Sequence, residues 1–182
     1  MDVQQQCVNA YRQHQNLKVA AQDVGIPWQT VYVHLRNAGE PVTGNKLKYG
    51  SESDRLAAKA ERIFLGLVPF AEDQNTRQFQ SKVDFLVRGF GIDVKASRLK
   101  IQGPNSSRWM YSVKKQEAIA DFFVCLGFDS EAETLESVLL VPGEIARMHT
   151  TISHSSRRGK WSDYLVSPAD LAPFFAALPS KS

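Results

Sequence analysis

The sequence contains little cysteine and no long apolar run, and these two absences narrow its class. Its 182 residues include two cysteines, Cys7 and Cys125, which stand far apart in the chain. This spacing excludes a disulfide-rich scaffold and offers no cysteine pair for zinc, so we expect two buried thiols in a reducing compartment. The longest apolar stretches, such as DFFVCLGF, are too short to cross a bilayer.

The first residues, MDVQQQC, also lack the basic and apolar regions of a signal peptide. We therefore expect a soluble cytoplasmic protein, with no membrane among its partners. Hydrophobic residues account for 43% of the sequence, which is enough for a packed core. The length suits one ordinary domain together with a small accessory domain.

Acidic residues are scarce in one long segment, although the net charge of the whole chain is only +3. Residues 82–115 contain only two of them, Asp84 and Asp93. The basic residues of the same segment are Lys82, Arg88, Lys95, Arg98, Lys100, Arg108, Lys114 and Lys115. A local excess of this kind suits a phosphate-bearing partner, and the alternative is a basic face that contacts only solvent.

Residues 17–39 predict two helices joined by a tight turn. Apolar residues recur at helical spacing on both sides of the turn, namely Leu17, Ala20, Ala21, Val24, Val31 and Leu35. Gly25 supplies the permissive backbone that a sharp turn needs, and Pro27 is compatible with the opening turn of the second helix. An earlier helix at about residues 3–14 would complete a three-helix unit.

This unit resembles a helix-turn-helix DNA-binding domain, which we assign to residues 1–40. In such a domain the second helix of the motif places residues near its start in the major groove of DNA. The candidate DNA contacts are Trp28, Gln29, Thr30, Tyr32, His34 and Arg36. Gln29 is suited to pair with a base edge and Arg36 to hold a phosphate. The alternative is a helical hairpin that packs against the second domain or a partner.

Residues 41–50 predict a linker, because Pro41, Gly44 and Gly50 interrupt any regular structure there. Lys46 and Lys48 lie in this linker, where they are placed to follow a phosphate backbone.

After the linker, apolar residues again recur at helical spacing, the pattern of a helix that lies on a sheet. Ser51 is expected to cap this helix. Its two glutamates of interest, Glu52 and Glu61, lie about half a turn of the helical wheel apart. Glu52 is better placed to reach past the sheet edge into a site, and the alternative is that it only complements the helix N-terminus.

The stretch SKVDFLVRGFGIDVKAS, residues 81–97, predicts a β-hairpin. Apolar and polar residues alternate with period two on both sides of RGFG. Asp93 and Lys95 therefore point to the same face, and Asp84 stands on the facing strand. If the register brings the two carboxylates together, they suit a hard divalent cation such as Mg²⁺. The Lys95 ammonium would orient a water and offset charge that develops on a phosphorane-like transition state.

The hairpin resembles the active-site region of the PD-(D/E)XK nucleases, also called restriction-endonuclease-like. Val83-Asp84 matches the Pro-Asp element without its proline, and Asp93-Val94-Lys95 matches the (D/E)XK element. The resemblance covers about residues 50–145. It implies an α/β fold in which the helix-turn-helix domain is followed by an αβββαβ core with a mixed sheet, in a nuclease domain of residues 51–182.

Three further elements support the resemblance: a helix at Ser112–Ala120 and strands at DFFVCLGF and SVLLVPGEI. Their order is similar to that in the Holliday-junction-resolvase and intron-encoded branches of the superfamily.

The resemblance also implies roles for individual residues. Asp84 and Asp93 become Mg²⁺ ligands, with the carbonyl of Val94 as a further oxygen ligand, and Lys95 becomes the catalytic lysine. Mn²⁺ is expected to substitute for Mg²⁺.

Further positions complete the implied site. Glu52 is the third acid, with Glu61 as the other choice. Ser97 and Gln116 are candidates for positioning phosphate or water.

Arg157, Arg158 and Lys160 predict a basic loop near the C-terminus, suited either to grip DNA or to form a surface loop. His149 and His154 have no Cys or Asp at metal-binding intervals, so we expect surface or structural histidines. The last segment, SPADLAPFFAALP, predicts a short helix that packs in the core or forms a dimer contact.

Together these features predict a magnesium-dependent DNA endonuclease of phage, mobile-element or restriction type, directed by the helix-turn-helix domain. The resemblance implies products with 5′-phosphate and 3′-hydroxyl ends. One active site cuts one strand, so a double-strand break needs a homodimer or sequential nicking. We expect the protein in a bacterial or phage-infected cell, associated with the nucleoid when bound to DNA. The alternatives are a structure-specific Holliday-junction resolvase and a DNA-binding regulator with an inactive nuclease-like domain.

Overall fold

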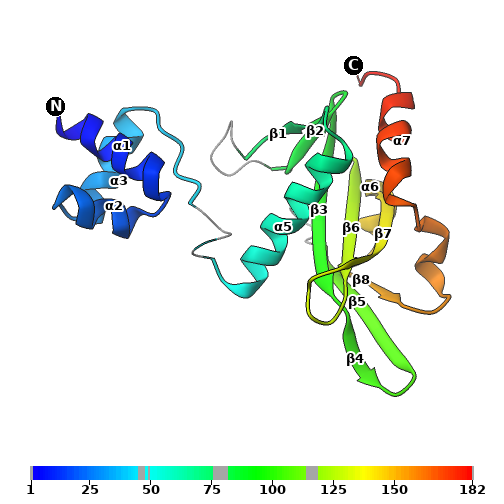
Figure 1. Cartoon of the computed structure of the whole chain (residues 1–182). Coiled ribbons are helices and arrows are strands. Elements are labelled where there is room, and N and C mark those ends of the chain that lie inside the picture. The colour runs from blue at the N-terminus through cyan, green and yellow to red at the C-terminus, as the bar shows by residue number, and fades with distance from the viewer. Residues whose placement is uncertain (1, 45–47, 49, 76–81, 114–118, 182) are drawn as a thin grey trace. The chain divides into compact units, whose positions relative to one another are not determined.

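The computed structural model describes residues 2–44, 48, 50–75, 82–113 and 119–181. The chain divides into two compact units. One comprises Met1–Arg55 and Asn75–Gln80, and the other comprises Leu56–Gln74 and Ser81–Ser182. The first unit is helical where it is described, whereas the second combines helices with two β-sheets (Figure 1).

The described part of the first unit is built from three helices ahead of the linker. They are α1 (Val3–His14), α2 (Leu17–Val24) and α3 (Trp28–Asn37). Asn16 begins α2, because its side-chain oxygen accepts hydrogen bonds from the N–H groups of Lys18 and Val19. Gly25 ends α2 with a φ of 78°, a left-handed conformation that glycine adopts without strain. The predicted three helices and the glycine turn are confirmed.

The core of the first unit lies between these helices. Its buried members are Cys7, Val8, Ala10, Tyr11, Ala20, Ala21, Val31 and Leu35. Val31 and Leu35 have no exposed surface, so the predicted inner face of α3 is confirmed. Ile26, which follows the glycine turn, packs against the same cluster.

The second unit contains a five-stranded mixed sheet. Its strands in spatial order are β1 (Glu72–Asp73), β2 (Phe85–Val87), β3 (Phe90–Arg98), β6 (Phe122–Phe128) and β7 (Leu135–Pro142). β3 and β6 are parallel, while the other neighbouring pairs are antiparallel. The α/β class and the mixed sheet after three N-terminal helices therefore agree with the prediction at this coarse level.

A second sheet contains three antiparallel strands. They are β4 (Lys100–Gly103), β5 (Ser106–Ser112) and β8 (Thr151–Ser155), in the order β4-β5-β8. The β4–β5 hairpin belongs to the crossover that joins the parallel strands β3 and β6. The sequence analysis did not anticipate this sheet, although Trp109, Tyr111 and Val113 are buried at alternate positions and signal a strand.

Apolar cores cover both faces of the five-stranded sheet. On one face, α5 (Glu52–Leu67) and α7 (Leu171–Ala177) pack Phe64 and Phe175 against strand residues such as Val94. On the other face, Trp109 of the second sheet packs with Phe123 of β6. Coverage of both faces explains why the β6 sequence is apolar at nearly every position.

The helix predicted at Ser112–Ala120 is wrong in its described part. Ser112 is the last residue of strand β5, and Val113, Ile119 and Ala120 are not helical. Residues 114–118 lie outside the described residues. The physical reason is that Trp109, Tyr111 and Val113 are buried at alternate positions, which is the period of a strand and not of a helix.

Several other predictions of local structure are confirmed. Ser51 begins α5 through reciprocal hydrogen bonds, since its Oγ accepts from the Asp54 N–H and the Asp54 carboxylate accepts from the Ser51 N–H. β7 ends at Pro142, and the short helix α6 (Gly143–Ala146) follows. Near the C-terminus, two 3-10 helices (Lys160–Tyr164 and Pro168–Asp170) precede α7. Within the described ranges, no helix is long and apolar enough to span a membrane.

Candidate functional site

The β2–β3 hairpin turns over two residues, Arg88 and Gly89, which have φ values of 52° and 87°. Positive φ at both central positions matches the twist of antiparallel strands. The turn pairs Val87 with Phe90 and sets the register in which Phe85 lies opposite Ile92. Asp84 is therefore placed immediately before β2, one position short of the strand.

Asp93 and Lys95 lie at alternate positions of β3, as predicted, and their side chains are paired. Lys95 Nζ is 3.3 Å from Asp93 Oδ2, and the side chains are 31% and 18% exposed. β3 is an interior strand, hydrogen-bonded to β2 on one side and to β6 on the other. The pair is therefore partly buried within the sheet and does not belong to a solvated edge.

Asp84 is held against β3 by its backbone and its side chain. Its N–H donates to the Ile92 carbonyl at 3.1 Å, and its own carbonyl accepts from the Gln74 N–H at 2.9 Å. Its Oδ2 accepts the N–H of Val94 at 2.8 Å. The Asp84 carboxylate thus contacts the backbone at the residue between Asp93 and Lys95.

The Asp93–Lys95 pair lies beside Phe123 and Cys125 of β6. Lys95 Nζ lies 6.0 Å from the centre of the Phe123 ring, and the parallel register places Lys95 beside Cys125. Burial raises the pKa of the Cys125 thiol to about 12, with Lys95 opposing and Asp93 adding to the rise. The Cys125 thiol therefore stays protonated and supplies no nucleophile here.

The donor set formed by Asp84, Asp93 and the Val94 backbone consists of oxygen atoms, which are the ligands that Mg²⁺ prefers. Such a cation needs only one or two carboxylates when water and substrate phosphate complete its shell. Among the described residues, no three His, Cys, Asp or Glu side chains gather as a ready-made metal site. The residues present fit a site of the two-carboxylate kind.

The other predicted residues of the catalytic set lie in different surroundings. Glu52 is exposed at the first position of α5, whereas Glu61 is half-buried farther along the helix. The buried Ser97 hydroxyl accepts the Met110 N–H at 3.0 Å and donates to the Arg98 carbonyl at 3.0 Å, so it ties β3 to β5. Gln116 lies outside the described residues.

The residues predicted to contact DNA lie on α3 outside its two buried positions, Val31 and Leu35. Trp28, Gln29, Thr30 and Arg36 are exposed, and Tyr32 and His34 are half-buried. Trp28 keeps 43% of its surface accessible. The start of α3 therefore has polar and aromatic groups that are accessible to solvent.

The predicted basic residues outside α3 are exposed wherever they are described. Lys48 is exposed, and Lys46 lies outside the described residues. Arg157 and Arg158 are exposed in the loop that follows β8, and Lys160 is exposed at the first position of the 3-10 helix after it. Arg157 Nη2 donates to Asn105 Oδ1 at 3.1 Å, which places the loop beside the β4–β5 turn.

The two histidines in question both pack against tryptophan rings. His154 is buried and stacks on Trp109, with ring centres 5.7 Å apart. His149 meets Trp161 edge to face at 4.9 Å. Both contacts agree with the prediction of structural rather than metal-binding histidines.

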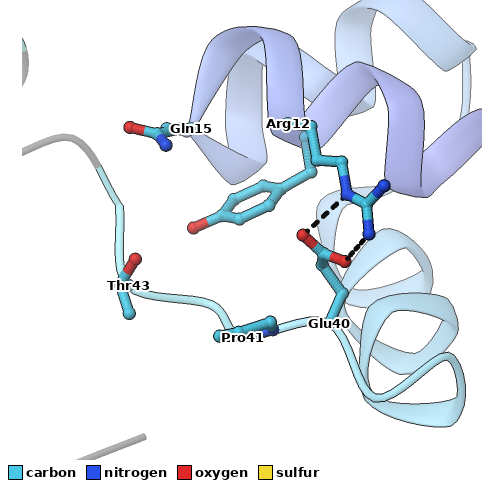
Figure 2. Close-up of a pocket in the computed structure, with 6 residues that line it drawn as sticks. Arg12, Gln15, Glu40, Pro41 and Thr43 are labelled. Carbon is cyan, nitrogen blue, oxygen red and sulfur yellow. Dashed lines mark hydrogen bonds and ion pairs between the residues drawn. The ribbon is translucent and has the colours of Figure 1, made fainter. Parts of the chain in front are cut away.

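A hollow of about 200 Å³ in the first unit connects the end of α1 with the chain that follows α3. Its lining includes Tyr11, Arg12 and Glu40 (Figure 2). Two hydrogen bonds of 3.0 and 2.7 Å join the Arg12 guanidinium to the Glu40 carboxylate. The Tyr11 hydroxyl accepts the Gly44 N–H at 2.8 Å. These contacts join α1 to the chain that follows α3.

Comparison with known proteins gives no relative from which a role could be transferred. No model of a protein family matches the chain, and no curated protein sequence matches it. The candidate site is therefore argued from its own residues.

Proposed function

We propose that the protein is a metal-dependent DNA endonuclease, in which the helix-turn-helix domain directs a PD-(D/E)XK-like domain. The observation that carries the proposal is the arrangement on β3. Asp93 and Lys95 are paired at 3.3 Å on an interior strand, and the Asp84 carboxylate is bonded to the residue between them. Taking charges partly out of water costs free energy unless they are paired, and this partly buried pair is the feature from which we infer a site.

Each residue has a distinct task in this proposal. Asp84 and Asp93 hold the cation, which, when bound, polarises a phosphoryl oxygen and acidifies water. Lys95 orients the attacking water and offsets negative charge on the phosphate as the bond to it forms. The neighbouring Asp93 keeps the Lys95 ammonium directed along the strand. The Glu52 and Glu61 carboxylates are the two choices for a third acid.

DNA is the proposed substrate because the chain carries two features that suit it. Exposed polar groups near the start of α3, such as Gln29 and Thr30, are suited to contact a DNA groove. The segment around the site is basic, with Arg98 at the end of β3 and Lys100 and Arg108 after it. A dimer of the chain would place two sites on the two strands of one duplex.

The test is a cleavage assay on plasmid and four-way-junction DNA with Mg²⁺. Wild type is compared with Asp93→Ala and Lys95→Ala, and with Arg62→Gln as a control at an exposed cation on α5. We expect cleavage by wild type and control, and a loss of about 10²-fold or more in both site variants. DNA binding without metal should persist in all four proteins.

Other outcomes would assign the protein differently. Intact substrates with undiminished DNA binding by wild type would discard the enzyme and leave a DNA-binding regulator. A strong preference for the four-way junction over every linear duplex would indicate a junction resolvase.

A further inference from the structure

The second sheet has one face in the core and one face toward solvent. Trp109 and Tyr111 are buried. Met110, which lies between them, and Arg108, which precedes Trp109, are exposed. The register aligns the outward residues in rows, which are Lys100 with Arg108 and Ser155, Met110 with Ser153, and Ser112 with Thr151. These residues form what we call the outer face.

The outer face is positively charged and rich in hydroxyl groups. The strands β4, β5 and β8 contain no acidic residue. Lys100 and Arg108 stand directly opposite each other, an arrangement that like charges make unfavourable in a sheet. The Arg108 guanidinium contacts a hydroxyl group: its Nη1 donates a hydrogen bond to Ser153 Oγ at 3.3 Å. An anion above this row would relieve the repulsion between the two cations.

The outer face is coupled to the candidate catalytic strand. Only Leu99 separates β3 from β4, and Ser97 on β3 accepts the Met110 N–H of β5 at 3.0 Å. An extended chain advances about 3.3 Å per residue, so Lys100 lies at most about 17 Å from Lys95. That reach corresponds to about five base steps of duplex DNA, at about 3.4 Å per step.

We propose that the outer face binds the phosphate backbone of duplex DNA, within about five base pairs of the bond that the Asp93–Lys95 site cleaves. Lysine, arginine and serine side chains are among the groups that hydrogen-bond to phosphate oxygens and sugars of DNA. The basic loop at Arg157, bonded to Asn105 in the β4–β5 turn, borders the same face. The position of the cut rests on the proposed nuclease function, whereas the DNA contact does not.

The test measures DNA affinity of the full chain at several salt concentrations, in EDTA so that no hydrolysis occurs. Each phosphate contact contributes about 0.9 to the slope of log K against log salt. The double variant Lys100→Gln with Arg108→Gln should therefore lower the slope by about 2. Arg62→Gln, an exposed cation elsewhere in the same unit, should leave the slope unchanged. Thermal melting confirms that each variant is folded.

The outcomes separate this inference from the nuclease proposal. A wild-type slope in the double variant, or no DNA binding by wild type, overturns the outer face as a DNA contact whatever the cleavage result. A lowered slope in a protein that never cleaves DNA supports the contact while the nuclease proposal falls. Preference for duplex RNA over DNA, with only the RNA affinity dependent on Lys100 and Arg108, overturns the assignment to DNA.

Discussion

The carboxylate of Asp84 and the backbone of Val94 are joined by a hydrogen bond of 2.8 Å between Oδ2 and the amide nitrogen. This bond attaches the first acid of the candidate site to the strand that carries the second. Asp84 therefore has two separable roles, one in holding the hairpin and one in binding a cation. An asparagine at position 84 would separate the two roles, because its amide oxygen accepts a hydrogen bond without carrying a charge.

Asp84→Asn is expected to keep most of the stability and to lose DNA cleavage. Asp84→Ala should lose cleavage and also about 1–2 kcal/mol of unfolding free energy, because the Val94 N–H loses its acceptor. Urea denaturation and the plasmid assay measure the two effects. If the Asn variant unfolds as readily as the Ala variant, the negative charge rather than the acceptor holds the hairpin.

Gly127→Ala should destabilise the second unit. A Cβ at Gly127 would lie 2.8 Å from the Tyr111 hydroxyl and 2.9 Å from the Trp109 Nε1. The indole cannot yield freely, because its Nε1 donates to the Phe128 carbonyl at 2.7 Å. We expect a loss of about 1–3 kcal/mol in denaturant unfolding.

Gly159→Ala is the matched control, since no atom lies within 4 Å of its added Cβ and its φ of −162° is extended. It should leave the stability unchanged or raise it by about 0.4–1 kcal/mol. Equal losses in both glycine variants would contradict the close approach of the two sheets at Gly127.

Acidification should weaken the second unit through His154. Burial lowers the pKa of this histidine below its ordinary value of 6.5. The unfolded chain therefore binds the proton more readily, and stability that is present above about pH 6.5 is lost as the pH falls toward the folded-state pKa. Wild type and His154→Gln are compared by denaturant unfolding between about pH 8 and pH 5.5, a window above most carboxylate titration.

The expected result is a smaller pH dependence in the glutamine variant than in wild type. Identical dependence in the two proteins would show that His154 does not carry the effect. Arg62→Gln is a suitable check that substitution alone does not alter the profile.

The two cysteines should report on the two units separately. Cys7 and Cys125 are fully buried free thiols, one in each unit, and burial raises the pKa of each. Neither should react with an alkylating reagent until its own unit opens. Pulsed alkylation in rising urea, with each peptide read by mass spectrometry, should give two different midpoints. A single shared midpoint would mean that the units unfold together.

Much of the local structure could be predicted from the sequence. The three N-terminal helices, the glycine turn, the Ser51 cap and the β2–β3 hairpin all follow from caps, turn residues and periodicity within a few positions. The shared face of Asp93 and Lys95 follows from period two alone. The second sheet could not be predicted in this way, because β5 pairs with β8, which lies far along the chain from it.

The sequence by itself therefore determined the three N-terminal helices, the helix after Ser51 and the hairpin, and which side chains share a face of β3. Only the tertiary structure decided which residues and how much solvent that face of β3 contacts. Pairing with β6 made β3 an interior strand, so Asp93 and Lys95 are partly buried instead of solvated. Pairing of β5 with β8 stacked Trp109 on His154 and turned Arg108 outward, opposite Lys100 of β4. Local preferences act within a few residues, whereas these contacts depend on strands that meet only when the chain has folded.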